Sequence, residues 1–256
     1  MSARSRVSVS SAPRRRRKPS LATRLRIFWI FIAATVGGLG YLAYLLVTLP
    51  ALRAQTIDIA IDGIAVTRAQ VLQAAAIDRT SNVWLLDTAG IERRIEAIPY
   101  VDTATVRRSP PGRIVIAVTE REPVACVYAG RAVVTVDASR RILQTGCARS
   151  DALAVLVPAG ELGPPGASAA PITLARLLAD ERALRAAGIT VRSIEQDRFG
   201  GLDAVQTDGF RLLIGSDGDI AAKAKLVGPI LAATRGGRPI RALDLRAPQT
   251  PIVQFR

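Results

Sequence analysis

One uninterrupted apolar segment dominates the hydropathy pattern near the amino terminus. Residues 27–49 are mostly apolar and carry no charge and no polar face. At 1.5 Å per residue, a helix of this length crosses a hydrocarbon layer about 30 Å thick with some tilt. The pattern therefore predicts a transmembrane helix, in which aromatic side chains toward the two ends act as interfacial membrane anchors: Phe28, Trp29, Tyr41 and Tyr44.

A cleaved signal peptide is the alternative interpretation of this segment. The apolar stretch of a signal peptide is normally about 7 to 15 residues long and is followed by a small-x-small cleavage site. Here the stretch is longer, and residues 52–54 (Leu-Arg-Ala) make a poor cleavage site. An uncleaved anchor is favoured.

Residues 55–122 are predicted to form a strand, two helices and two further strands. Isoleucine at every second position of residues 57–61 is typical of a half-buried strand. Thr67 and Gln70 have the spacing of a capping box, in which each side chain satisfies a free N–H group of the other residue. Thr88 is expected to begin the second helix in the same way.

A hairpin is predicted to follow the two helices. Residues 101–107 and 113–119 are rich in β-branched side chains, and a Ser-Pro-Pro-Gly turn at residues 109–112 separates them. The hairpin can bury its apolar face under the helices, which gives a compact α+β module of about 65 residues.

Residues 123–256 are predicted to form a β-rich domain with two flanking helices. A loop rich in Gly, Pro and Ala separates its two halves at residues 159–170. The whole chain is therefore expected to be of the α+β class: one transmembrane helix, a βααββ module and a β-rich domain. The domain's strands are predicted at 124–128, 132–136, 141–144, 190–195, 202–206, 211–214, 240–245 and 251–255, and its helices at 171–187 and 219–234.

The charge distribution predicts the orientation in the membrane. The formal net charge is +14, and nine Lys or Arg with no acid lie in residues 1–26, which leaves about +5 for the rest. Residues 1–26 are expected to be a disordered basic tail. Cations beside a span stay on the cytoplasmic side, so residues 50–256 are predicted to be extracytoplasmic. Binding of nucleic acid or anionic lipid by the tail is the alternative, and a topology signal is the simpler explanation.

Two cysteines, Cys126 and Cys147, lie in the region predicted to be exported, where oxidation is possible. They are 21 residues apart, on what are predicted to be neighbouring strands. The sequence leaves open whether they form a disulfide or remain two buried thiols.

The chemistry of an enzyme is not indicated. The chain has no His, which excludes Ser-His and Cys-His nucleophile pairs and His metal ligands. Glu92 and Glu96 lie one turn apart, but arginines interleave with them, as on a solvated surface. No phosphate-binding loop is present. We therefore expect no catalytic residue, no metal ion, no cofactor and no small-molecule substrate, and no nucleic-acid partner.

Short motifs around the predicted hairpin carry a resemblance to a known family. These motifs are Ile-Pro-Tyr-Val at 98–101, Val-Arg-Arg at 106–108, Pro-Pro-Gly-Arg-Ile-Val-Ile at 110–116 and Glu-Arg-Glu-Pro-Val-Ala at 120–125. Together with the order of the parts, they resemble the FtsQ/DivIB family of bacterial cell-division proteins over residues 20–256. The second domain departs from the pattern at Ser139 and Arg140, where the family usually has Gly.

The resemblance implies a fold and a role. Residues 55–122 would be a POTRA-type domain and residues 123–256 the family's β domain. The protein would be a non-catalytic scaffold of the divisome in the inner membrane at the septum, with FtsB- and FtsL-like bitopic proteins as partners. The POTRA-type domain would serve recruitment, and the last strand would offer its edge to a partner segment.

The last strand has the sequence features of an edge. Pro248 and Pro251 would disrupt a central strand but are tolerated at an edge, where a partner strand can add through main-chain hydrogen bonds. Ala247 stands where the family often has an aromatic residue. The alternative is that the apolar residues are core and the arginine is solvated. The candidate partner-binding residues are Arg246, Gln249, Ile252, Val253 and Phe255, with Arg198 as a weaker candidate.

Two rival functions are compatible with parts of this pattern. A POTRA-bearing secretion or assembly protein would need a β-barrel or repeated POTRA modules, and the sequence indicates neither. A membrane-tethered cell-wall enzyme would need a cleft with paired carboxylates.

Overall fold

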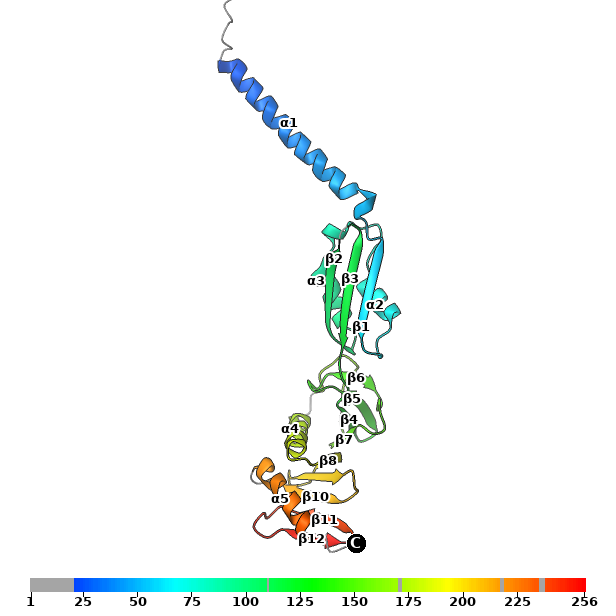
Figure 1. Cartoon of the computed structure of the whole chain (residues 1–256), viewed down its shortest axis with the longest axis vertical. Coiled ribbons are helices and arrows are strands. Elements are labelled where there is room, and N and C mark those ends of the chain that lie inside the picture. The colour runs from blue at the N-terminus through cyan, green and yellow to red at the C-terminus, as the bar shows by residue number, and fades with distance from the viewer. Residues whose placement is uncertain (1–20, 110, 170–171, 217–218, 235–237) are drawn as a thin grey trace, which may run out of the picture.

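The computed structural model describes residues 21–256 except 110, 170–171, 217–218 and 235–237. A long helix, a three-stranded module and a nine-stranded sheet follow one another along the long axis (Figure 1). This arrangement confirms the predicted α+β class.

The first helix, α1 (Leu21–Thr48), begins earlier than the sequence pattern predicted. Residues 21–26 were assigned to the disordered tail and are helical instead, because nothing in Leu-Ala-Thr-Arg-Leu-Arg interrupts a helix. The rest of the predicted tail lies outside the described residues. By length and composition, Arg24–Leu45 is able to cross a membrane, and none of it is buried against the protein. All four predicted anchor residues are exposed on this helix: Phe28, Trp29, Tyr41 and Tyr44.

The three-stranded module has its third strand at the centre. The strand order is β1-β3-β2, with β1 parallel and β2 antiparallel to β3. Two helices bury apolar residues against the sheet, and the core includes Val71, Ile91, Ile95 and Ile116. The elements are β1 (Thr56–Asp62), α2 (Arg68–Ala75), the short 3-10 helix η2 (Val83–Leu85), α3 (Thr88–Glu96), β2 (Val101–Ser109) and β3 (Arg113–Glu120).

Helix caps explain where the two helices of this module begin. The predicted capping box of α2 is present, because Gln70 N donates to Thr67 Oγ1 and Thr67 N donates to the Gln70 side chain. The prediction for α3 is wrong by one residue. Asp87 is the cap and accepts a hydrogen bond from Gly90 N at 2.9 Å. A carboxylate there also interacts favourably with the positive end of the helix dipole, which Thr88 cannot match.

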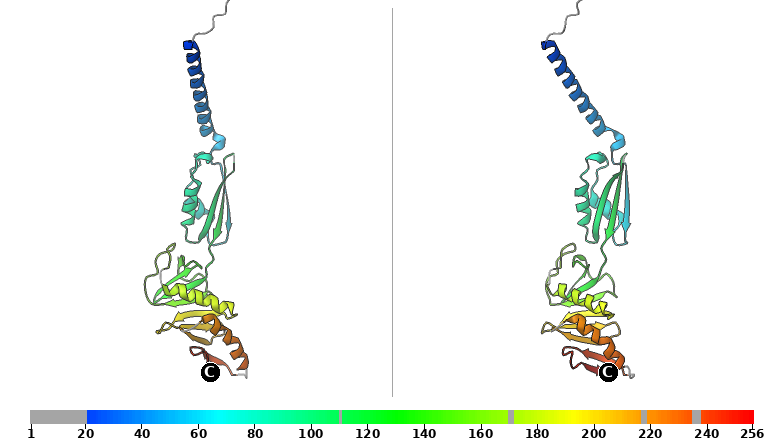
Figure 2. Two further views of the ribbon diagram at one scale, coloured as in Figure 1. Left: turned by 90° about the vertical axis from the view of Figure 1, so that its left-hand side faces the viewer. Right: turned by 60° about the vertical axis from the view of Figure 1, so that its left-hand side comes forward.

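The nine-stranded sheet has the order β12-β11-β10-β9-β8-β7-β4-β5-β6. Helices α4 (Ile172–Ala186) and α5 (Ile220–Ala233) lie beside each other against it (Figure 2), and they enclose the larger apolar core. The strands are β4 (Ala125–Ala129), β5 (Ala132–Val136), β6 (Ile142–Thr145), β7 (Leu153–Val157), β8 (Val191–Gln196), β9 (Leu202–Gln206), β10 (Arg211–Gly215), β11 (Ile240–Asp244) and β12 (Ile252–Phe255).

Strand β7 was not predicted. It joins the two halves of the sheet, because it pairs in parallel with both β4 and β8. A strand buried between two parallel neighbours is a short apolar run without alternation, and periodicity alone does not distinguish such a run from other buried segments.

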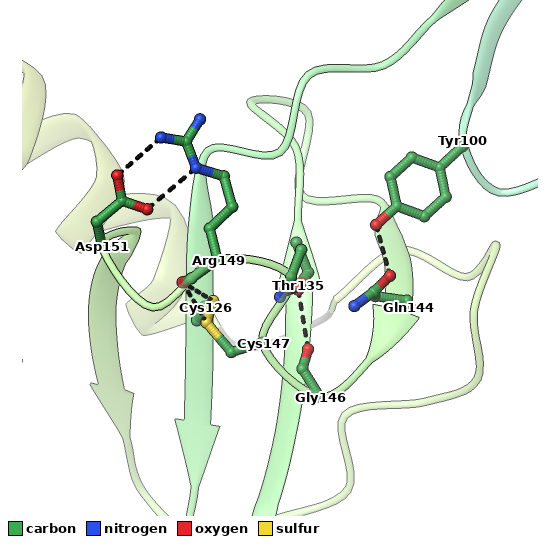
Figure 3. The surroundings of a disulfide bond; sticks show 9 residues. Tyr100, Cys126, Thr135, Gln144, Gly146, Cys147, Arg149 and Asp151 are labelled. Atoms are coloured by element: carbon green, nitrogen blue, oxygen red, sulfur yellow. Dashed lines mark hydrogen bonds and ion pairs between the residues drawn. A yellow bond between two sulfur atoms is a disulfide. The ribbon is translucent and has the colours of Figure 1, made fainter. Parts of the chain in front are cut away.

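The cysteines form a disulfide, which resolves the question that the sequence left open. Cys126 lies on β4 and Cys147 follows β6, and their Cα atoms are 5.3 Å apart (Figure 3). The same loop is held by Thr135, whose hydroxyl donates to Gly146 O at 2.8 Å and accepts from Ala148 N at 2.9 Å.

Polar contacts join the module to the sheet. Arg121 donates to Asp137 at 2.7 Å, and it also bonds Val101 O at 2.9 Å. Tyr100 donates to Gln144 on β6 at 2.7 Å (Figure 3). The two sheets are therefore connected by a set of specific hydrogen bonds as well as by the chain.

Candidate functional site

Strand β12 forms one end of the nine-stranded sheet. It pairs antiparallel with β11, and no other described strand lies beside it. The register places Val253 opposite Leu243 and Phe255 opposite Ile240. The outer side of β12 is therefore a sheet edge, as the sequence pattern led us to expect.

The direction of the main-chain groups on this edge follows from one hydrogen bond. Arg256 N donates to Pro239 O at 2.9 Å, so the main chain of Arg256 faces β11. Successive strand residues point their N–H and C=O groups to opposite sides. The main-chain groups of Val253 and Phe255 therefore point outward, while those of Gln254 face β11.

Of the three other sheet edges, those at β2 and β6 receive main-chain cover from the protein itself, whereas the edge at β1 receives, within the described part of the chain, one hydrogen bond, from Arg68 to Ile57 O at 2.9 Å. On β2, Ala104 N and Val106 N donate to the carboxylates of Glu96 and Glu92 at 3.2 and 2.7 Å. These two acids, expected on a solvated face, thus protect an edge. On β6, Ile142 exchanges main-chain bonds with the loop at residues 166–167. Strand β12 differs from both in having two outward residues without such cover among the described residues.

The apolar residues of β12 divide between surface and core. Ile252 is 57% exposed and Phe255 is 41% exposed, so both are available for contact. Val253 is half-buried and packs against the core of the sheet. The exposure of Ile252 and Phe255 leaves their side chains accessible, whereas the side chain of Val253 packs inward, and partner contact by all three stays a prediction.

Arg246 lies in the turn after β11 and is held by an internal carboxylate. Its Nε is 3.0 Å from both oxygens of Asp244, and its Nη2 bonds one of them. The hydrogen bonds from Arg246 hold the pKa of Asp244 below its usual value despite burial, and Lys223 adds to the effect. The guanidinium of Arg246, a candidate partner-binding residue, is thus largely occupied by Asp244, and the pair fixes the turn that leads into β12.

A hollow of about 610 Å³ lies between this turn and α5. Gln249 lines it and is exposed, together with Arg246. Lys223 lines it as well, although this side chain is only 4% exposed and donates to Ile214 O at 2.7 Å. The sequence analysis did not select Lys223, because a Lys on an apolar helix is usually solvated.

Arg198 is in the turn between β8 and β9, where its guanidinium lies 4.7 Å from the centre of the Phe199 ring. Asp197 shapes this turn by accepting from Phe199 N and Gly201 N. Phe199 is exposed and lines a small hollow of about 110 Å³ with Arg246. Phe199, which was not among the predicted site residues, therefore contacts Arg198 and lines the same hollow as Arg246.

The acids near this hollow are not equivalent to one another. Burial raises the pKa of Asp203 on β9, and the negative charge of Asp197 raises it further, while Arg211 opposes the shift. Within the described residues, no group of three His, Cys, Asp or Glu side chains is arranged to hold a metal ion.

Comparisons with known proteins agree with this architecture. A family model described as the POTRA domain, FtsQ-type, matches residues 54–121. The cell division protein FtsQ of Streptomyces griseus is 34% identical over 200 residues, which cover 73% of this chain and 90% of that protein. FtsQ of Myxococcus fulvus is 36% identical over 64 residues, which cover 25% of this chain and 22% of that protein.

Among solved structures, the chain is similar to the major extracytoplasmic domain of the cell division protein DivIB from Geobacillus stearothermophilus. The alignment covers 44% of this chain and 92% of that domain. The identity is 17% and the TM-score 0.27, and a likeness of this strength carries no argument about the fold.

The apolar helix, the matched module and the second sheet define a POTRA-bearing protein of the cell-division class. The similarity to the Streptomyces protein extends over most of both chains. The chain belongs to the FtsQ/DivIB family of cell division proteins.

Proposed function

We propose that this protein is a non-enzymatic scaffold of the divisome that links FtsB- and FtsL-like bitopic proteins at the division septum by strand addition to β12. The observation that carries the proposal is the outward direction of the main chain at Val253 and Phe255, on an edge that no described strand covers. A partner strand bonds to those groups, and Ile252 and Phe255 supply apolar contacts beside it.

The contrast with the edges at β2 and β6 supports this choice. Edges that are covered by side chains or loops resist strand addition, whereas an open edge invites it. Glu92 and Glu96 cover β2, and a loop covers β6. The hollow beside β12, lined by Gln249 and Arg246, offers room for the part of the partner that continues beyond the added strand.

The proposed location is the inner membrane, with the amino terminus in the cytoplasm and the two sheets outside. Helix α1 has the length and composition of a span, and the cations of residues 1–26 lie before it. The Cys126–Cys147 disulfide lies in the part assigned to the oxidising side of the membrane.

A scaffold role without catalysis is consistent with the hydrogen bonds that Glu92 and Glu96 form within the protein. Glu92 and Glu96, which stand one turn apart as a carboxylate pair would, bond to the main chain of β2. The sequence has no His to act as a general base or metal ligand.

Co-purification with an FtsB-like membrane protein of the same organism tests the proposal. The double substitution Ile252→Glu and Phe255→Glu should abolish recovery of that protein while the thermal unfolding of the variant stays normal. Ile64→Glu is the matched control, because Ile64 is a fully exposed apolar residue on the POTRA-type module. Equal recovery with the double variant and the control would overturn the edge-strand proposal.

A further inference from the structure

The 3-10 helix η2 lies at the end of the POTRA-type module that meets α1 (Figure 1). It forms an exposed aromatic tip, because Trp84 is 54% exposed and Leu85 is 68% exposed, while Val83 is buried. Large apolar side chains exposed beside a membrane span indicate an interaction site, because their contact with water is unfavourable.

Hydrogen bonds fix this tip to the end of α1. The side-chain amide of Asn82 donates to Val47 O at 3.1 Å, and Ala54 N donates to Ser81 O at 3.1 Å. Asn82 also forms a β-bridge with Arg53. The tip is therefore bonded to the last turn of α1 at Val47, which lies two residues beyond the apolar window that ends at Leu45.

The surface next to the tip combines apolar and cationic groups. Val47, Leu52, Trp84 and Leu85 line a hollow of about 420 Å³ together with Asn82. Arg53 is exposed on one side of it. Indole rings with neighbouring cations are typical of the zone between head groups and acyl chains.

Two arginines and two acids lie close to the tip along the chain or through hydrogen bonds. Arg108 donates to Leu86 O at 2.6 Å and is exposed, as Arg53 is. Asp87 caps α3, and Asp78 bonds to Thr80, so both carboxylates have partners within the protein. Arg53 and Arg108 are both exposed, and lipid phosphates would be natural counter-ions for them.

We propose that the Trp84–Leu85 tip enters the head-group region of the outer leaflet and holds the POTRA-type module against the membrane that α1 spans. The occupant of the hollow is then lipid, not a second protein. The inference rests on the proposed membrane topology. With the tip embedded, the POTRA-type module has a fixed orientation relative to the membrane. Strand β12, at the far end of the chain, then also has a fixed orientation relative to the membrane.

The chain has two tryptophans, which makes the test direct. Full-length protein is reconstituted into vesicles of phosphatidylglycerol and phosphatidylethanolamine, with a fraction of the lipid brominated near the head groups. Trp29→Phe leaves Trp84 as the only reporter of the tip, and Trp84→Phe leaves Trp29 as the only reporter of α1. Bromine quenches a tryptophan only at short range.

The expected result is that Trp84 loses at least half of its fluorescence in brominated vesicles compared with vesicles of the same lipids without bromine. A third variant, Trp29→Phe, Trp84→Phe and Phe199→Trp, places the only tryptophan at an exposed site of the second sheet and should not be quenched. Replacing Arg53 and Arg108 by Gln should reduce the quenching of Trp84.

Two results would overturn the inference in different ways. Quenching of Trp29 without quenching of Trp84 would show a spanning helix and a tip in water, which refutes the docked tip alone. Absence of quenching for both tryptophans would show that neither α1 nor the tip lies in the membrane. That result would refute the proposed topology together with this inference.

Discussion

Arg121 and Asp137 form an ion pair of 2.7 Å that joins the POTRA-type module to the nine-stranded sheet. Both side chains are largely buried, and Arg121 also contacts Asp102 at 3.1 Å and Val101 O at 2.9 Å. Arg121 immediately follows Glu120, whose carboxylate accepts hydrogen bonds from three successive N–H groups at residues 64–66. In the Glu-Arg motif at the end of β3, Glu120 thus holds a loop within the module, and Arg121 forms a contact between the two sheets.

Replacing Arg121 by Ala should destabilise the junction. The change leaves Asp137 buried without its cation, and the loss of one partner of a buried pair costs about 3 kcal/mol. We expect a lower midpoint in urea unfolding and a broader distance distribution between labels on the two sheets. Arg149→Ala is the matched control, because the Arg149–Asp151 pair is exposed and should contribute little to stability. Equal effects of the two substitutions would contradict the structural role of Arg121.

The contribution of Asp137 should depend on pH. Burial raises the pKa of this carboxyl, but hydrogen bonds from Ser139 and Arg121 and from the main chain outweigh burial and hold the pKa below its usual value of 3.8. A folded-state pKa below the unfolded value contributes stability above pH 3.8, and this stability is lost as the pH falls through the folded-state pKa. The difference in unfolding free energy between the native protein and Asp137→Asn should therefore be constant near pH 7 and shrink below pH 3.8. A difference that grows on acidification would show the opposite sign of the shift.

The disulfide should stabilise the second sheet. Cys126 and Cys147 close a loop with a sequence separation of 21, for which loop-closure entropy predicts about 3 kcal/mol. The free energy of unfolding of the double variant Cys126→Ala and Cys147→Ala should be lower by that amount, so the variant should unfold at a lower denaturant concentration. A reducing agent should lower the unfolding temperature of the native protein in calorimetry and leave that of the variant unchanged. A native protein insensitive to reduction would contradict a stabilising bond.

The acids that cover β2 should suppress association of the module. Replacing Glu92 and Glu96 together by Ala leaves Ala104 N and Val106 N without acceptors, and an edge with free N–H groups recruits other strands. We expect self-association in analytical ultracentrifugation and a loss of about 1–3 kcal/mol per removed hydrogen bond to a charged group. Gln at both positions keeps an acceptor oxygen and should stay monomeric. A monomeric Ala variant would argue that this edge needs no cover.

The first module was predictable because its signals are local. Isoleucine alternation, the Thr67 capping box and the Ser-Pro-Pro-Gly turn each depend on a few consecutive residues. The structure confirms the first two and places strands on both sides of residues 109–112, of which Pro110 lies outside the described residues. The cap of α3 was misplaced by one residue because Asp87 and Thr88 are both good caps, and sequence does not show which of them has the extended backbone that a cap requires.

The second sheet depends on pairings between distant segments, which short-range patterns do not contain. Strand β7 takes its identity from its neighbours β4 and β8, so its run of apolar residues was ambiguous. The Arg246–Asp244 pair and the contact of Arg198 with Phe199 are local, but each depends on the conformation of its turn, which residue types alone do not show. Residue types alone showed these arginines as available, whereas the structure shows what already holds them.

The edge position of β12 was expected from Pro248 and Pro251 and from the family resemblance, and the sheet order agrees with it. Which main-chain groups face outward could not be read from the sequence, because alternation has two possible phases and only the bond from Arg256 to Pro239 selects one.

Amide hydrogen exchange resolved to single residues tests strand addition to β12 most directly. The full-length protein is compared alone and with its FtsB-like partner. Without the partner, Val253 and Phe255 should exchange fast and Gln254 slowly, because only the last of these faces β11. On complex formation, exchange at Val253 and Phe255 should slow at least tenfold while that of Gln254 changes little. A stable complex in which Val253 and Phe255 continue to exchange at their free rates would contradict the account.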